Sequence, residues 1–522
     1  FEHQNGKHTL ILGNDPSVHQ PCPNQAQARY GYMSGGVQDK DMITRLHIDQ
    51  ELQPGKVTLT DYYFQTPSND LKVSAPSAVS VGGNGKFEIY DYPGYYAKRF
   101  DGDDKAGKVR PDGERTAKLG MQGEEASHKL LTGASSCRAF VPGYKFELIE
   151  HRRKDLNGPY VLTQVSHAAT NNLGDGEGST YDNTFTAIPA AVPVRPNRVT
   201  AKPLVHGTQT AVVVGMKGEE IDTDKYGRVK VQFHWDREGK KDQNSSCWIR
   251  VAQPWAGKGY GTAHIPRIGS EVVVAFLEGD PDQPLIIGSV YNAEQTVPYL
   301  LPANKMVQGI RSNSTPGGGG YNEIIVNDTK GKEKITVHGQ YDMNTTVEHD
   351  QTTTVHNNRT DKIDVDDSET VGNNQKLTVG VNQDVKIGSN QTISVGAKQK
   401  VTVGSDQTIG VGAKQGLSVA SDQTVAVGAA RTVSVSAADK LTVGSNRTVS
   451  IGAAHKVGVS GAEEITVGGT QTISVSGAIK ITSGASITLE VGGSCIKIGP
   501  GGIDIISSAP ITITGAVVKV NS

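Results

Sequence analysis

The 522-residue chain is poor in the features that mark disulfide-rich, membrane-spanning or nucleic-acid-binding proteins. Its cysteines, Cys22, Cys137, Cys247 and Cys495, are far apart and form no CxxC pair, which predicts free thiols in a reducing compartment. No run of about 18 apolar residues occurs, so no segment is predicted to span a membrane as a helix. The formal net charge is only −2, so no global field attracts nucleic acid.

Signatures of common enzymes are also absent. The sequence contains no GxxxxGK[ST], HExxH or GxSxG motif. The glycine-rich stretches 82–85 and 317–320 do not lie between a strand and a helix, as a phosphate-binding loop requires. Asp222, Asp224 and Asp236 would need a cleft to act as a glycosidase pair, and no sequence feature indicates one. We therefore expect no catalytic residues, no cofactor and no metal site.

Residues 347–482 lack Phe, Tyr, Trp and Pro altogether. In their place is an eight-residue repeat without a single insertion, seen from Val371 as VGNNQKLT, VGVNQDVK and IGSNQTIS. Its first position is always Val or Ile, and its seventh is aliphatic in every octad from Leu377 onward. A disordered low-complexity segment would not keep two aliphatic positions in strict phase, so the repeat predicts a regular β-structure.

Each octad is predicted to have two faces and a corner. Positions seven and one are two residues apart, so on a strand they point to one side, while positions six and eight point to the other. Gly at position two suits a corner, which leaves a strand of about five residues and a corner of about three. The aliphatic side chains are the predicted core: Val371, Leu377, Val379, Val385, Ile387, Ile393, Val395, Val401, Val403, Ile409, Val411 and Leu417.

Two aliphatic side chains cannot stabilise one octad, so the octads are expected to stack, as in solenoid proteins. The repeat leaves two arrangements open. A single chain can coil with three octads per turn, or three chains can interweave, each giving one face per layer. With strands about 4.8 Å apart, the seventeen octads of 347–482 would rise roughly 27 Å in the first arrangement and roughly 80 Å in the second.

The residues before the repeat predict smaller β-rich segments. Alternating stretches at Lys56–Thr60 and Phe87–Tyr90 indicate strands, and GEEASHKLL at Gly123–Leu131, ended by Gly133, indicates a helix. Between 210 and 292, five short stretches punctuated by Gly, Pro and Asp indicate the strands of a small barrel of the OB type.

Histidines and tryptophans are candidates for binding. His349, His356 and His455 in the octads would form rings around the axis of a trimer, able to hold a metal or an anion, but outward-facing polar side chains are the favoured interpretation. Trp235, Trp248 and Trp255 in the barrel are of the kind that binds oligonucleotides or oligosaccharides. Packing in the core and between chains is the favoured interpretation for them.

The last forty residues, 483–522, depart from the octad pattern but stay rich in aliphatic residues. The last layer of a β-prism exposes backbone edges and apolar side chains, so this end predicts a partner that caps it. At the other end the chain begins at Phe1, within a predicted strand, so we expect the sequence to be a fragment. The predicted tip and partner-binding residues are Ile511, Ile513, Val517, Val518, Lys519, Val520, Asn521 and Ser522.

Several long segments resemble one known family. GMKGEEIDTDKYGRVKVQFHWDREG at 215–239, and the barrel sequence after it, resemble the valine–glycine repeat (VgrG) family of bacterial type VI secretion systems. The link GIRSNSTPGGGGYNEIIVNDTKGKEKI is similar to the family's neck, and DYYFQTPSNDL and FEIYDYPGYY are similar to its phage-hub-like part. The resemblance covers essentially the whole chain. It implies a mainly β fold with these parts: the latter part of a hub-like base domain at 1–195, an OB-fold barrel at 196–300, a neck at 301–346, a three-chain interwoven triangular β-helix at 347–482, and the end of this needle with its tip at 483–522.

The resemblance also implies function and partners. Members of the family are homotrimers, similar to a fused phage hub and tail spike, that are fired by a contractile sheath into a neighbouring cell. The implied partners are two further copies of the chain, a PAAR-repeat tip protein, an Hcp-like tail-tube protein, effector proteins and, transiently, the target membrane. The implied route is synthesis in the bacterial cytoplasm, assembly on the secretion baseplate, and release to the extracellular space or the target cell.

Two alternatives stay open at this point. One is a baseplate spike of a contractile phage or phage-derived particle, although the motif VQFHWDREG favours the secretion family. The other is a spike fused to a toxin domain that would lie beyond residue 522.

Overall fold

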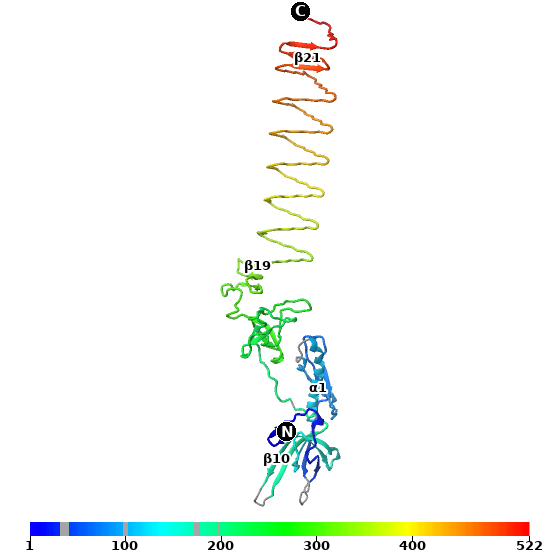
Figure 1. Ribbon diagram of the computed structural model, residues 1–522, viewed down its shortest axis with the longest axis vertical. Coiled ribbons are helices and arrows are strands. Elements are labelled where there is room, and N and C mark those ends of the chain that lie inside the picture. The colour runs from blue at the N-terminus through cyan, green and yellow to red at the C-terminus, as the bar shows by residue number, and fades with distance from the viewer. Residues whose placement is uncertain (32–40, 98–102, 172–177, 197, 521–522) are drawn as a thin grey trace. The chain divides into compact units, whose positions relative to one another are not determined.

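The computed structural model describes residues 1–31, 41–97, 103–171, 178–196 and 198–520, which form two compact units, residues 1–362 and 363–522. The ribbon in Figure 1 is mainly extended chain, so the prediction of a mainly β protein is confirmed. The helical segments are α1 (Val109–Glu125) and the short 3-10 helices η1 (Pro16–Val18), η2 (Asn84–Lys86), η4 (Asp103–Lys108), η5 (Lys154–Leu156) and η6 (Leu277–Gly279).

A closed barrel forms the first core of unit 1, with strands in the order β10–β11–β8–β4–β3–β9. Their bounds are β3 Gln27–Tyr30, β4 Met42–Gln50, β8 Lys129–Ser135, β9 Lys145–Ile149, β10 Gly158–Thr170 and β11 Thr180–Pro189. Inside, the ring of Phe146 lies 4.8 Å from that of Phe140 and 5.8 Å from that of Phe185. Gly133 in β8 leaves room for this cluster, because a Cβ there would lie 2.5 Å from the Phe185 ring. A hairpin of β1 (Glu2–Gln4) and β2 (Lys7–Thr9) precedes the barrel in the chain.

A small sheet packed against α1 forms the second core. Strands β5 (Lys56–Leu59), β6 (Val73–Pro76) and β7 (Glu88–Asp91) pair in the order β6–β5–β7, and α1 contacts β5 and β6. The helix buries Val109, Ala117 and Met121, whose spacing in multiples of four places them on one face. Gly113 completes that face, because a Cβ there would lie 2.7 Å from the ring of the buried Tyr96.

The helix does not lie where the sequence predicted it. The prediction placed a helix at Gly123–Leu131, but α1 ends at Glu125 and strand β8 begins at Lys129. Leu131 is fully buried in the barrel, and β8 pairs with both β4 and β11. This tertiary pairing overrides the local helical pattern. The strands predicted around 56–60 and 87–90 are confirmed, as β5 and β7.

A second, smaller barrel follows, and all its predicted strands are present. They are β12 (Gln209–Val214), β13 (Lys230–Phe233), β14 (Arg250–Val251), β15 (Glu271–Phe276) and β16 (Pro284–Val290). They pair in the order β13–β12–β15–β16–β14, and two backbone hydrogen bonds between Val229 and Ile249 join the ends of this sheet into a ring. Val213, Val231 and Val272 are among the side chains that fill its interior.

A three-stranded antiparallel meander comes after the second barrel in the chain. It consists of β17 (Val307–Arg311), β18 (Glu323–Asn327) and β19 (Lys334–His338), with β18 in the middle. The stacked rings of Tyr321 and His338, with centroids 4.5 Å apart, lie beside the guanidinium of Arg311, 3.8 Å from the Tyr321 ring centre. These contacts order the segment that connects the barrel to the octads.

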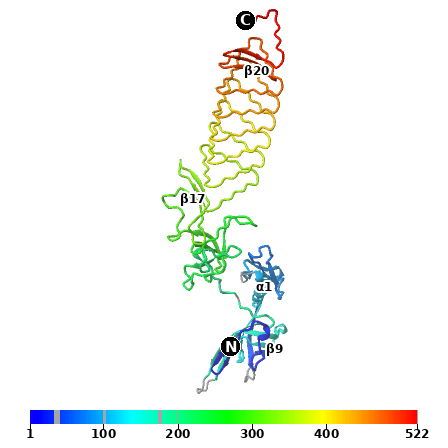
Figure 2. The same cartoon turned by 45° about the horizontal axis from the view of Figure 1, so that its top comes forward.

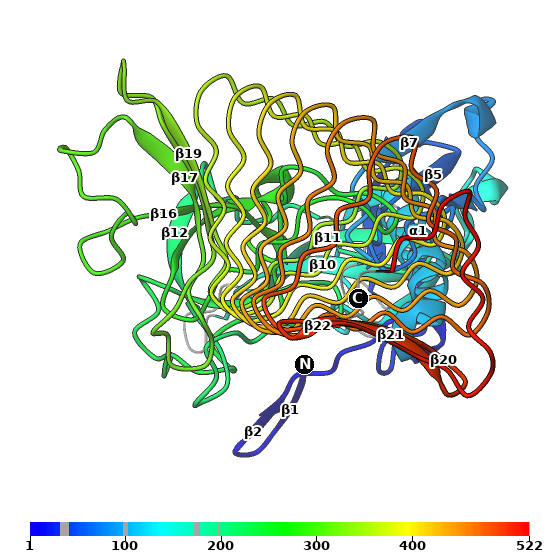
Figure 3. The same cartoon turned by 90° about the horizontal axis from the view of Figure 1, so that it is seen from above.

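Unit 2 is an open coil over most of its length. Bends recur every eight residues, at 364–365, 372–373 and onward to 484–485, in phase with the glycines of position two. Figures 1 and 2 show consecutive turns of this coil, yellow to orange, standing apart, and Figure 3 looks along them. Near its end, β20 (Ile487–Val491), β21 (Ser494–Gly499) and β22 (Gly502–Ile506) form an antiparallel sheet. The predicted octad period is present, but the octads of 365–486 form no paired strands within this chain.

Candidate oligomerisation interface and tip

The backbone of the octads has no partner of its own. Residues 365–486 are all described, and no backbone hydrogen bond joins any two of them. Extended chain exposes one N–H donor and one C=O acceptor at each residue that is not proline, and this segment contains no proline. Both edges of every octad are therefore free to pair with other strands.

The octad side chains separate into two faces, as the alternation predicts. Arg359 and Asp361, at positions five and seven of one octad, form an ion pair with 3.0 Å between Nε and Oδ2. Thr466 and Glu464, at positions eight and six, share a hydrogen bond of 3.3 Å. Odd positions therefore share one face, and even positions share the other.

The predicted core residues lie on the face of the odd positions, but the chain alone does not bring them together. Val403 at position one is 46% exposed, and Ile409 at position seven is 66% exposed. The other ten predicted residues, from Val371 to Leu417, are exposed to a similar degree. The result is an apolar stripe that follows the coil, next to unpaired backbone. Large exposed apolar surfaces of this kind mark interaction sites.

The tip residues are also exposed. Ile511, Ile513, Val517, Val518 and Val520 are all exposed, whereas Asn521 and Ser522 lie outside the described residues. The bends at 508–509 and 516–517 keep the eight-residue phase of the coil. The segment 507–520 therefore repeats the octad geometry beyond the sheet of β20–β22.

The sheet of β20–β22 replaces three octads without loss of phase. Its turns lie at 492–493 and 500–501, one octad and two octads after the bend at 484–485. Gly492 and Gly493 have φ values of +49° and +88°, which allow the chain to reverse there instead of turning a corner. Here the chain supplies its own strand partners, and the glycine pairs together with the departure from the octad pattern are the sequence signals of this change.

The loop of the meander is anchored to the second barrel by Glu220. Its Oε1 accepts a hydrogen bond of 2.6 Å from the backbone N–H of Gly317. Arg267 approaches the same carboxylate at 3.7 Å and donates a 2.6 Å hydrogen bond to the carbonyl of Asn313. The hydrogen bond from Thr315, followed by that from Gly317, lowers the pKa of Glu220 below its usual value.

A contact between one aromatic ring and two guanidinium groups joins the region of the helix-packed sheet to the second barrel. The ring of Phe64 lies 5.1 Å from the guanidinium of Arg228 and 5.0 Å from that of Arg250, and it meets the ring of Tyr226 edge-on at 5.3 Å. A cavity of about 190 Å³ adjoins this contact, with Trp248 in its lining. Sequence reasoning missed this contact, although the aromatic run YYF at 62–64 was a signal that could have indicated it.

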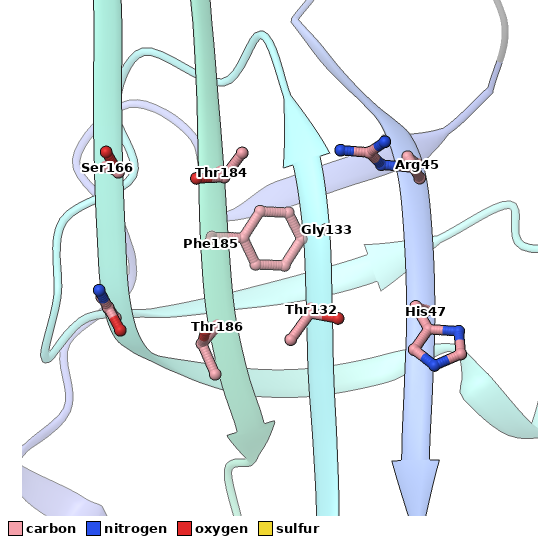
Figure 4. A pocket seen from close by; sticks show the side chains of 9 residues that line it. Arg45, His47, Thr132, Gly133, Ser166, Thr184, Phe185 and Thr186 are labelled. Carbon is pink, nitrogen blue, oxygen red and sulfur yellow. The ribbon is translucent and has the colours of Figure 1, made fainter.

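A concavity on a sheet face of the first barrel, shown in Figure 4, is lined mostly by polar side chains. It encloses about 380 Å³ and is formed by β4, β8, β10 and β11. Arg45, His47, Thr132, Thr184 and Thr186 project from neighbouring strands onto it. His47 pairs instead with Asp49 at 2.9 Å, and no hydrogen bond found in the described residues joins its ring to a hydroxyl of this face. The face suits a polar partner or water and shows no nucleophile held by a base.

The three aspartates of the second barrel stabilise its turns. Asp222 accepts a hydrogen bond from the N–H of Met216, and Asp236 accepts bonds from the N–H groups of Glu238 and Gly239. Asp224 accepts from the N–H of Tyr226 and Arg228 and also binds the Arg228 guanidinium at 2.8 Å. The carboxylate oxygens of these three aspartates thus accept hydrogen bonds within the barrel, which explains the aspartates without a substrate.

Trp235 and Trp255 are not core residues of the barrel. They are 70% and 62% exposed in the single chain, because the barrel interior is filled by aliphatic side chains, so the core part of the prediction is wrong. Their packing between chains stays a prediction. Trp248 is half-buried under the amine of Lys230, 4.6 Å from the ring centre. In the octads, His349 is exposed and pairs with Asp350 at 2.9 Å.

Among the described residues, no group of three or more His, Cys, Asp or Glu side chains could hold a metal ion. No described helix is long and apolar enough to cross a membrane. The four cysteines form no disulfide, and burial raises the pKa of the Cys137 thiol to about 12.

Known families match three successive parts of this architecture. The phage tail baseplate hub (GPD) family matches residues 1–173, which include the helix-packed sheet and every strand of the first barrel except β11. The type VI secretion system/phage-baseplate injector OB domain matches 209–291, which is the second barrel. The bacteriophage T4 gp5 C-terminal trimerisation domain matches 308–419 and 405–475, which include the meander and most octads.

Curated relatives extend across these parts. The chain is 40% identical over 370 residues to the type VI secretion system spike protein VgrG1b of Pseudomonas aeruginosa, covering 70% of this chain and 48% of that protein. The chain belongs to the VgrG family. VgrG4b of the same organism is 41% identical over 377 residues, covering 70% of this chain and 45% of that protein. VgrG3 of Vibrio cholerae is 35% identical over 359 residues, covering 67% and 33%.

The VgrG resemblance seen in the sequence is thereby confirmed. The chain spans about half the length of the curated relatives VgrG1b and VgrG4b. Among solved structures, the Escherichia coli c3393 protein, described as a type VI secretion component similar to T4 tail proteins gp27 and gp5, has a TM-score of 0.25 at 23% identity, covering 34% of this chain and 43% of that one. A PdpA–VgrG complex has a TM-score of 0.29 at 8% identity, covering 57% and 59%.

Proposed function

We propose that this chain forms the trimeric spike of a bacterial type VI secretion system, which caps the tail tube, punctures the target envelope and carries a tip protein and effectors. The observation that carries the proposal is the octad segment 365–486, whose backbone has no partner in its own chain and whose aliphatic stripe is exposed. Its named relatives are type VI secretion system spike proteins.

The unpaired backbone favours three interwoven chains over a single coiled chain. In a single-chain solenoid, each turn forms hydrogen bonds with the turn before it. The turns of this coil form none, and they stand apart in Figure 2. Two further copies, related by a threefold axis, would supply the missing strands and cover the stripe that includes Val403 and Ile409. The match to a trimerisation domain supports the same arrangement.

The mechanical role follows from that arrangement. Every strand of the octad segment would lie between strands of the two other chains. No chain could then unfold without breaking its backbone hydrogen bonds to both of the others. A closed prism also has no free lateral edge, which protects it from aggregation. A rod pushed through an envelope needs stiffness and does not need catalysis, so we propose that the spike is not an enzyme.

The partners are assigned by position. The exposed residues between Ile511 and Val520 would bind a PAAR-type tip protein, and residues 1–195 would belong to the base that meets an Hcp-like tail tube. Residues 196–300 and 301–346 would be the OB barrel and the neck. Effectors would travel with the spike from the bacterial cytoplasm, through the baseplate, to the extracellular space or the target cell.

The test is the mass and the shape of the purified chain. Light scattering should give three times the mass of one chain, and negative-stain images should show a rod of roughly 80 Å beyond a wider base. A single-chain mass with a stub of roughly 27 Å would contradict the proposal.

A phage or phage-derived baseplate spike is the second candidate, because the hub and trimerisation families that match are phage families. Capture by a purified Hcp-type tube protein from the same genome, and not by a phage tube protein, would favour the secretion system. The opposite result would favour the phage particle.

A further inference from the structure

The octad repeat poses a problem of register for three interwoven chains. Position one is Val or Ile throughout, and position seven is aliphatic from Leu377 to Ile481. If one chain slipped by a whole octad, every aliphatic contact in this stretch would be replaced by an equivalent one. The apolar core therefore cannot specify the register, and repeats without a polar marker are prone to slippage.

The geometry of the trimer defines which octads are neighbours, and this step rests on the proposed function. Each chain contributes one strand to each layer, and each octad moves the chain one face around and one layer up. The strand directly above octad n on a face is therefore octad n+1 of another chain. Side chains at the same octad position in consecutive octads would lie about one strand spacing, roughly 4.8 Å, apart across an interface between chains.

Charged residues follow this neighbour relation closely. Where the same position carries Lys, Arg, Asp or Glu in two consecutive octads of 347–482, eight of the nine pairs are of opposite sign. Position four gives the longest unbroken run and position five the next. The eight pairs are Lys398/Asp406, Asp406/Lys414, Lys414/Asp422, Arg431/Asp439, Asp439/Arg447, Arg359/Asp367, Lys376/Asp384 and Lys456/Glu464.

Other octad separations show no such preference. Two octads apart, which is the contact made by a one-octad slip, only three of nine charged pairs are opposite. Lys398 would then face Lys414, and Asp406 would face Asp422. Three octads apart, which is the neighbour in a single-chain coil, only two of six pairs are opposite. The charges therefore complement one another only in the three-chain arrangement in its native register.

The single like-charged pair has partners of its own. Asp361 and Glu369 follow each other at position seven. Asp361 forms its ion pair with Arg359 in the same octad, and Glu369 accepts hydrogen bonds of 3.2 Å from the Gln375 side chain. By contrast, no ion pair joins two side chains within residues 365–486, all of which are described. The charged side chains at position four, from Lys398 to Asp422, therefore have no ion-pair partner within their own chain.

We infer that the column of alternating charge at position four, on the face opposite the aliphatic stripe, forms ion-pair ladders between copies of this chain and fixes their octad register. The surface involved is the edge of each octad strand, and the partner is a second copy of the chain whose octad n+1 lies above octad n. Opposite charges on neighbouring strands stabilise a pair, and like charges destabilise it. A slip of one chain by one octad would turn most of these pairs into repulsive ones in both of the interfaces that this chain makes.

Disulfide trapping reads the register directly. Thr424 and Thr432 occupy position six of consecutive octads, so cysteines at both sites should link different chains into a covalent trimer only in the native register. Thr408 and Thr424 are two octads apart, so cysteines there should link only chains that have slipped by one octad. Both pairs are placed in the full chain with Cys247→Ser and Cys495→Ser.

Two variants of equal net charge separate charge order from charge content. The block variant Asp406→Lys/Lys414→Asp gives the order plus, plus, minus, minus along position four, which favours a slipped contact. The control Lys398→Asp/Asp406→Lys/Lys414→Asp/Asp422→Lys inverts every sign and keeps the alternation. After refolding, the ratio of 424–432 to 408–424 cross-links should fall about tenfold or more in the block variant and stay at the wild-type value in the control.

Two further measurements complete the test: the salt dependence of the cross-link ratio in the block variant, and the cross-linking of the chain with unaltered charges. At about 1 M NaCl, where screening acts within roughly 3 Å, the block variant should approach the wild-type ratio, because position four lies on the outer face. If the block variant keeps the wild-type ratio at low salt, the inference about register is wrong while the trimer stands. If the unaltered charge sequence gives no 424–432 link at all, the proposed trimer itself fails.

Discussion

A single charge placed on the core face of the shaft is the most demanding test of the structure. Ile409 points to the face of the odd positions and is 66% exposed in one chain, and the trimer would cover it. At about 25 cal/mol per Å², replacing it by Asp loses about 2 kcal/mol of apolar burial per chain. Keeping an aspartate neutral in a dry core at pH 7 requires a pKa rise of roughly three units, which adds about 4 kcal/mol.

The expected loss for Ile409→Asp is therefore about 6 kcal/mol per chain, comparable with the whole stability of a small domain. The matched control is Thr408→Asp, which places the same charge one residue earlier on the outer face and should change stability by less than about 1 kcal/mol. Thermal unfolding at equal protomer concentration, followed by circular dichroism with light-scattering mass, measures both variants.

The pH dependence gives a second readout for Ile409→Asp. A raised folded-state pKa means that the destabilisation is present above the unfolded value of about 3.9 and shrinks as the pH falls toward it. The gap between variant and wild type should therefore narrow near pH 4. Equal melting of Ile409→Asp and Thr408→Asp at pH 7, both as intact trimers, would refute the assignment of the two faces.

Three other predictions concern the tip, the neck and the base. Deletion of residues 511–522 should abolish pull-down of a PAAR-type protein while the trimer mass is kept, and unchanged pull-down would remove the tip assignment. Hydrogen bonds from Thr315 and Gly317 lower the pKa of Glu220, so its contact with the loop of the meander should be present above the unfolded pKa of 4.5 and be lost as the pH falls through the folded value. Hydrogen exchange at the Gly317 N–H should therefore become faster in acid. In Glu220→Ala this exchange should be faster at any pH. Phe64→Ala should destabilise unit 1 by about 1–3 kcal/mol through loss of its contacts with Arg228, Arg250 and Tyr226, whereas Phe87→Ala, at an exposed ring, should have little effect in the same denaturant titration.

Sequence reasoning succeeded where a local pattern has one structural solution. The octad phase, the five strands of the second barrel and the strands around 56–60 and 87–90 all follow from hydrophobic spacing and from glycine positions, which act over a few residues. The VgrG family assignment also followed from the sequence, because long motifs such as 215–239 are specific. The candidate core and tip residues remain predictions, since a single chain does not bring them together.

Sequence reasoning failed where distant segments decide the outcome. The helix lies at 109–125 because Gly113 and Ala117 fit against Tyr96 and the sheet, whereas 129–135 was drawn into the barrel by pairing with β4 and β11. The contact of Phe64 with Arg228 and Arg250 joins residues more than 160 positions apart and has no local signature. The exposed Trp235 and Trp255 show the same limit, because burial depends on what else fills the interior.

The sequence by itself determined that residues 347–482 form a regular repeat with one apolar face, because period and side-chain direction are properties of the local chain. It did not decide how that repeat is completed, since one chain and three chains satisfy the same period. Only the tertiary structure revealed that the octads of 365–486 leave their backbone hydrogen bonds unmade. Which strand lies beside which is a long-range property, and the unpaired edges favour a partner from outside the chain.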